Sequence, residues 1–171
     1  MAEPERRHTI AVLVDNEPGV LARVVGLFSG RGYNIDSLTV AEVDKARGLS
    51  RINIVARGSE YVIEQIKALL AKLVPVHKVL DLTIEGGHVE RELALVKVTG
   101  DRGRLIQALR IADVMHARLV ASAPGSLVLE ATGTSDELDA FIDLVEPVEV
   151  SRAGIVAIGR GDSVLGARPA G

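Results

Sequence analysis

Residues 15–40, with the sequence DNEPGVLARVVGLFSGRGYNIDSLTV, decide the fold of this chain because they predict a strand–turn–helix–turn–strand unit. A polar turn follows an apolar strand at 8–14, and Pro18 stands where the first turn of a helix tolerates proline. Apolar residues then recur at helical spacing and form one face, namely Leu21, Val24, Val25 and Phe28. Gly30 ends this helix, and alternation predicts a second strand at 35–42.

The rest of the N-terminal half completes a strand–helix–strand–strand–helix–strand order. Strands are predicted at 50–57 and 76–84, and Ser59 is a suitable N-cap for the helix between them. The apolar face of that helix consists of Val62, Ile66, Leu69, Leu70 and Leu73. Both helices then lie on one side of the sheet, and we expect its other side to be open and to invite pairing with a second copy.

The same order recurs after Gly86-Gly87 as a weak internal repeat of pattern. Strands are predicted at 92–98, 118–122, 127–132 and 148–150, with one helix after the turn at 100–103 and another capped by Ser135. The predicted fold class is therefore α+β, with two βαββαβ domains. We place the domains at 1–85 and 86–159, followed by a loose tail at 160–171.

Composition excludes several classes of function. The net charge is −3 and there is no cysteine, so neither a general nucleic-acid surface nor a disulfide framework is expected. The four histidines are far apart, and we expect no metal site. The N-terminal residues lack the apolar core of a signal peptide, and no apolar run reaches the ~20 residues that span a bilayer. These features favour a soluble, cytoplasmic protein with no membrane partner.

The polar turn before the first helix is the main candidate for a binding site. A helix N-terminus presents unpaired N–H groups and a partial positive charge, which suits a carboxylate. Asn16 either caps the helix or holds polar atoms of a ligand, and Gly19 lets a ligand approach the backbone closely. Asn34 opens the second strand, close to the first turn of its own domain or of a partner. The residues alone leave a purely structural turn equally open.

Two other classes of protein are compatible with the predicted order of elements or with the length of this chain. An RNA- or metal-responsive module can use the same βαββαβ order. RNA-binding sheets need aromatic residues on their strands, whereas Phe28, Tyr61 and Phe141 map to helices and Tyr33 to a turn. A stand-alone enzyme needs a Ser/His/Asp or carboxylate constellation, which we do not find, so no catalytic residue is expected.

Several runs of sequence carry a more specific signal. They are NEPGVL at 16–21, RVVGLF at 23–28, RGYNIDSLTV at 31–40, HVEREL at 88–93 and EVSRAGIV at 149–156. Together they resemble the small subunit of acetolactate (acetohydroxyacid) synthase, with its N-terminal ACT domain. The resemblance covers nearly the whole chain, although 101–125 matches loosely and 145–149 is shorter than the usual stretch.

The resemblance implies two ferredoxin-like domains and a non-catalytic, regulatory role. In that family a large catalytic subunit, which is the implied partner, holds thiamine diphosphate, Mg²⁺ and FAD and condenses pyruvate with pyruvate or 2-oxobutyrate. The small subunit needs no cofactor of its own. It raises the large subunit's activity and confers feedback inhibition by a branched-chain amino acid, usually valine. A stand-alone ACT-type amino-acid sensor acting on another partner is the alternative.

The resemblance also implies where the effector binds. In the family it sits between two ACT domains of a homodimer, with higher assemblies possible. Matched onto this chain, one protomer contributes Asn16, Gly19, Val20 and Leu21, and its partner contributes Asn34 and Ile35. Backbone and amide N–H groups would hold the carboxylate, and small apolar side chains would hold an isopropyl group.

Overall fold

The computed structural model describes residues 4–162 and 164–166 and divides into two compact units. The first unit consists of the chain up to Val89 together with residues from Ile155 onward. The second unit is Glu90–Gly154. The sequence had placed the first boundary after residue 85 and had given 86–159 to the second domain. Residues 155–159 instead pack with the N-terminal unit, because tertiary contacts rather than local sequence assign them.

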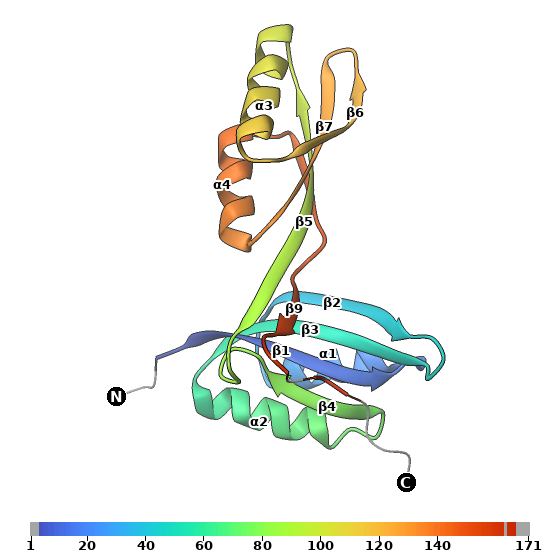
Figure 1. Cartoon of the computed structure of the whole chain (residues 1–171). Helices are drawn as coiled ribbons and strands as arrows, with labels where there is room; N and C mark the ends of the chain where they lie inside the picture. The colour runs from blue at the N-terminus through green and yellow to red at the C-terminus, as the bar shows by residue number, and fades with distance from the viewer. Residues whose placement is uncertain (1–3, 163, 167–171) are drawn as a thin grey trace. The chain divides into compact units, whose positions relative to one another are not determined.

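The N-terminal unit has the predicted order of elements (Figure 1). Its four strands form one antiparallel sheet in the order β2-β3-β1-β4. The elements are β1 (Arg6–Asp15), α1 (Val20–Ser29), β2 (Ile35–Asp44), β3 (Leu49–Gly58), α2 (Glu60–Ala71) and β4 (Val76–Asp81). Ser59 caps α2 as predicted, because its side chain accepts a hydrogen bond from the Val62 amide at 3.4 Å.

The main core lies between this sheet and its two helices. Buried members are Ile10, Val12, Val14, Val20, Val24, Phe28, Ile52, Ile54, Ala56, Ile63, Ile66, Leu70 and Val76. The apolar face of α1 was predicted to begin at Leu21, but it begins one residue earlier. Val20 is buried, whereas Leu21 is 38% exposed. The reason is that residues spaced by four (20, 24 and 28) line the inner side of the helix.

The second face of the sheet is covered, and the expectation that it is open was wrong. A further strand, β9 (Val156–Gly159), and Leu165 after it pack on this face within the same unit. Ala157 joins Ala11 and Leu82 in a buried cluster against which Leu80 and Leu165 pack. Of the loose tail predicted at 160–171, residues 163 and 167–171 lie outside the described residues, and Leu165 contributes to the packing. We call residues 155–162 and 164–165 the C-terminal strap.

Hydrogen bonds fix the strap to β2 and β3. The Ile155 amide donates to Ser37 Oγ at 2.8 Å, and Thr39 Oγ1 donates to the Ile155 carbonyl at 3.0 Å. Arg51 Nη2 donates to the Ala157 carbonyl at 2.6 Å. Partial burial lowers the pKa of Arg51 from its ordinary value, because it disfavours the charged form.

The second unit repeats the plan and confirms the predicted α+β fold class. Its sheet has the order β6-β7-β5-β8. The elements are β5 (His88–Thr99), α3 (Arg102–Val114), β6 (Arg118–Ala123), β7 (Ser126–Gly133), α4 (Ser135–Val145) and β8 (Glu149–Arg152). Thr134, rather than the predicted Ser135, caps α4 in a capping box with Glu137. Among the described residues, no helix is long and apolar enough to cross a membrane.

Candidate functional site

The N-terminus of α1 is open. Gly19 is its N-cap, with φ +84°, and the helix has neither a side-chain cap nor an acidic residue in its first turn. No atom lies within 4 Å of the position a Cβ of Gly19 would take. The Val20 amide donates to the Glu17 carbonyl at 3.4 Å, and the helix dipole acts together with the remaining first-turn N–H groups, which is the arrangement that binds a small anion.

Asn16 does not cap the helix, which settles one of the two roles considered for it. Its backbone amide donates to the Gly48 carbonyl at 2.7 Å, and its side-chain Nδ2 donates to Glu42 Oε1 at 3.1 Å. The contact with Glu42 orients the side-chain amide and leaves its Oδ1 as an acceptor beside the helix N-terminus. Oδ1 is therefore suited to the ammonium group of a ligand.

Val20 and Leu21, the two residues after Gly19, differ in solvent exposure. Val20 is buried in the core, at 4% exposure, whereas Leu21 is 38% exposed on the helix surface. Val20 therefore fixes the first turn, and Leu21 offers an apolar contact to a group bound there.

Asn34 and Ile35 lie at the opposite end of the same sheet. Ile35 pairs with Ala56, which pairs with His8 near the start of β1, whereas Asp15 at the end of β1 pairs with Leu49. His8 and Asp15 are seven residues apart along β1, which corresponds to about 23 Å at the rise per residue of a β-strand. One chain therefore does not bring its own Asn34 beside its own Gly19.

The side chain of Asn34 is exposed and oriented by its neighbours. Its Nδ2 donates to Asp36 Oδ1 at 3.0 Å, and Asp36 Oδ2 accepts from Arg57 Nε at 2.9 Å. Strand β2 is at the edge of the sheet, with Val40 and Val43 exposed at 46% and 55%. An exposed edge with apolar side chains is suited to pairing with a second copy.

Sequence reasoning missed Glu42 and the strap contacts of Ser37 and Thr39. Glu42 reaches Asn16 across 26 residues of chain, because the β2–β3 hairpin brings its end beside the turn. No local signal marks that contact. Within the described residues, no group of three or more His, Cys, Asp or Glu side chains is arranged to hold a metal ion.

Two family models match this chain and together cover most of it. Residues 10–78 match the acetohydroxyacid synthase small subunit-like ACT domain, and residues 91–161 match the small subunit of acetolactate synthase. This chain belongs to the acetolactate synthase small-subunit family. The match to both halves confirms the resemblance inferred from the sequence runs.

Relatives and a solved structure agree with this family across the whole chain. The isozyme 3 small subunits of Salmonella typhimurium and Escherichia coli are 43% and 42% identical, each over 93% of this chain and 99% of the relative. A probable small subunit from Archaeoglobus fulgidus is 43% identical over 91% of this chain and 98% of its own length. The crystal structure of the small subunit from Thermotoga maritima matches with a TM-score of 0.82 and 36% identity, covering 92% of this chain and 99% of that one.

Membership in the acetolactate synthase small-subunit family supports a regulatory role for this chain. Its N-terminal unit carries the ACT domain. A small subunit implies a catalytic subunit of acetolactate synthase as its partner.

Proposed function

We propose that this chain activates an acetolactate synthase large subunit and makes it sensitive to feedback inhibition by valine or another branched-chain amino acid. The observation that carries this proposal is the open N-terminus of α1 at Gly19. A regulatory domain with an uncapped helix end, an adjacent amide acceptor and apolar neighbours suits an α-amino acid.

Each group of the effector has a complementary partner at this turn. The carboxylate accepts hydrogen bonds from first-turn N–H groups of α1, which carries no acidic residue in that turn. The ammonium donates to Asn16 Oδ1, which Glu42 holds in place. The isopropyl group contacts Leu21 and the partner's Ile35.

A homodimer is part of this proposal, since the residues of one site lie at two ends of one sheet. A two-fold arrangement of two N-terminal sheets brings the α1 turn of one protomer to Asn34 of the other, and it produces two equivalent sites. The effector then favours one arrangement of the two protomers by its differential affinity, and the large subunit responds to that arrangement. Higher assemblies are compatible with the same interface.

Thiamine diphosphate, Mg²⁺ and FAD belong to the large subunit in this proposal, and this chain supplies no catalytic group. The chain acts in the cytoplasm, where that enzyme finds its substrates. A stand-alone amino-acid sensor acting on a different partner is the alternative, and only reconstitution separates the two.

The test combines ligand binding with reconstitution. Thermal unfolding of the chain is measured with L-valine, L-leucine, L-isoleucine, L-serine and D-valine, since a ligand that binds only the folded form raises its stability. The chain is then added to an acetolactate synthase large subunit, and acetolactate formation is followed with and without L-valine. A stabilisation by L-valine together with valine-sensitive activation supports the proposal. Valine binding without any effect on a large subunit favours the alternative partner.

A further inference from the structure

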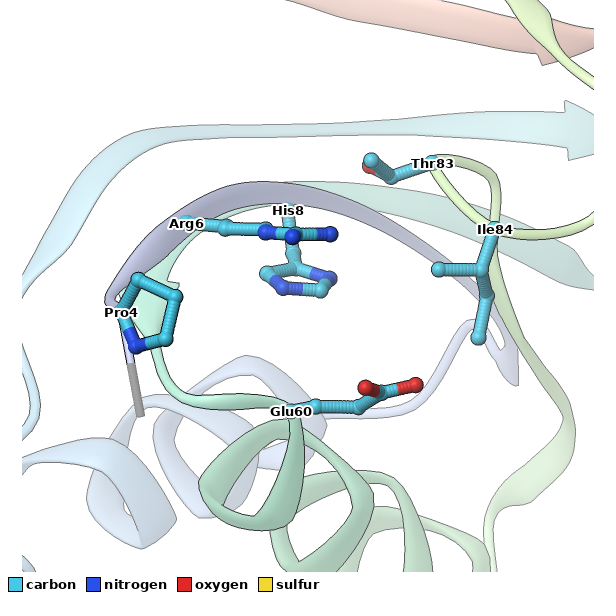
Figure 2. Close-up of a pocket in the computed structure, with 6 residues that line it drawn as sticks. All are labelled: Pro4, Arg6, His8, Glu60, Thr83 and Ile84. Atoms are coloured by element: carbon cyan, nitrogen blue, oxygen red, sulfur yellow. The ribbon is translucent and has the colours of Figure 1, made fainter. Parts of the chain in front are cut away.

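A cavity of the N-terminal unit lies away from the α1 turn. Its volume is about 280 Å³, and it is formed by the start of β1, the first turn of α2 and the segment after β4 (Figure 2). The lining residues are Pro4, Arg6, His8, Glu60, Thr83 and Ile84. Arg6 and His8 lie near the start of β1, whereas the α1 turn follows the end of β1 at Asp15, so this cavity is separate from the α1 turn.

His8 forms the inner wall of the cavity and is only 3% exposed. Its Nδ1 lies 2.7 Å from Oδ2 of Asp81, which is fully buried. Oδ1 of Asp81 accepts a hydrogen bond from the Thr83 amide at 3.0 Å. The other ring nitrogen of His8, Nε2, accepts or donates a hydrogen bond according to the protonation of the ring.

Nε2 of His8 is buried and has no hydrogen-bond partner among the described residues. A buried polar atom without a partner is unfavourable, so Nε2 is suited to a hydrogen-bonding group held in the cavity. The Glu60 carboxylate is directed into the same space from the first turn of α2 (Figure 2). A carboxylate that faces the cavity suits a group with several N–H donors, such as an ammonium.

Arg6 supplies the opposite charge on the same cavity. Neither Arg6 nor Glu60 forms an ion pair in the part of the chain that the structure describes, although both line this space. A ligand with a carboxylate for Arg6 and an ammonium for Glu60 gives both charged groups a partner, and His8 Nε2 can donate to the carboxylate or accept from the ammonium. Pro4 and the half-exposed Ile84 add an apolar wall for an aliphatic side chain.

We propose that this cavity binds a free α-amino acid at a second site, through Arg6, His8 and Glu60. The inference does not depend on the effector site at the α1 turn. It assigns a ligand to a buried histidine that the regulatory role proposed above leaves without a function.

The experiment follows the imidazole nitrogen signals of the full chain by ¹⁵N NMR, with His8 assigned by comparison with His8→Gln. The chain carries Gly19→Asp, so that binding at the α1 turn does not contribute. The common L-amino acids are added one at a time, and methylammonium and acetate are added separately as probes of each charged half. We expect at least one amino acid to move the His8 Nε2 signal to saturation, and to do so at lower concentration than either fragment.

Two exposed variants test the charged partners without removing the buried histidine. Glu60→Gln and Arg6→Gln should each weaken binding by about tenfold, the usual effect of losing a hydrogen bond to a charged group. Glu64→Gln, one turn further along α2 and outside the cavity, should bind as the parent chain does. The proposal is overturned if no amino acid moves the His8 signal, if both cavity variants bind normally, or if methylammonium binds as tightly as any amino acid.

Discussion

The guanidinium of Arg152 forms two hydrogen bonds with the buried carboxylate of Glu92. Nη2 lies 2.7 Å from Oε2, Nε lies 3.1 Å from Oε1, and Glu92 is 6% exposed. These bonds, with a second carboxylate from Asp139, raise the pKa of Arg152 above its already high ordinary value. The pair joins the HVEREL run at the start of β5 to the EVSRAGIV run at β8, so two distant runs of family sequence share one structural role.

Replacing Glu92 with Gln should destabilise the C-terminal unit. The substitution removes the charge that pairs with Arg152 and leaves a mismatched amide in a buried position, which we expect to cost about 2 kcal/mol. Urea unfolding of the full chain measures the change. Glu149→Gln is the control, because the pair of Glu149 with Lys97 is exposed and should contribute little. Equal stability of the two variants would contradict a structural role for the buried pair.

Gly19→Asp should abolish the valine response while leaving activation of the large subunit mostly intact. A carboxylate at this position occupies the anion site and repels the carboxylate of the effector, so valine binding should weaken by at least about tenfold. Calorimetry with L-valine and an inhibition curve of the reconstituted enzyme measure the two effects.

Gly19→Asn is the matched control for that prediction. Asparagine has nearly the same shape as aspartate, carries no charge and tolerates positive φ. It should retain more valine affinity than Gly19→Asp. If both variants lose valine binding equally, the effect is steric rather than electrostatic, and an unchanged response of Gly19→Asp would refute the site.

Asn34→Ala should weaken valine binding by about 1–3 kcal/mol, the usual cost of removing one hydrogen-bonding partner of a bound polar group. Calorimetry on the purified chain gives the dissociation constant. Asp36→Ala serves as a comparison, since it removes only the neighbour that orients Asn34 and should have a smaller effect. A dissociation constant unchanged in Asn34→Ala removes this residue from the site.

A mixture of two variant chains tests whether each site is shared between protomers. In a mixed dimer of Gly19→Asp and Asn34→Ala chains, one site carries both substitutions and the other carries neither. Unfolding and refolding the two chains together should therefore restore tight valine binding to part of the sample. Mixtures that bind no better than the separate variants would show that Gly19 and Asn34 do not meet across an interface.

The C-terminal strap should be needed for the stability of the N-terminal unit. Ala157→Asp places a charge in the buried cluster with Ala11 and Leu82, and we expect a loss of about 3 kcal/mol or more. Val156→Asp is the neighbouring control, because Val156 is 53% exposed. Thermal unfolding of both variants measures the difference. A strap that merely rests on the surface would make the two variants equally stable.

The sequence by itself determined the order of elements, the α+β class, the turn before α1 and the family. These features depend on local patterns, such as Pro18 before an amphipathic helix and the periodicity of apolar residues, and such patterns are visible in short windows of sequence. Gly19 was recognised for the same reason, because a glycine at a helix start leaves the backbone accessible.

Only the tertiary structure decided where the strap lies, what Asn16 contacts and where the two parts of the site are. Residues 155–159 show no local sign of packing on Ala11 or of bonding to Ser37, because these contacts join positions more than a hundred residues apart. The separation of Gly19 from Asn34 follows from strand register, which places them at opposite ends of one sheet. Long-range pairing depends on the packing of the whole unit, and a local pattern cannot specify it.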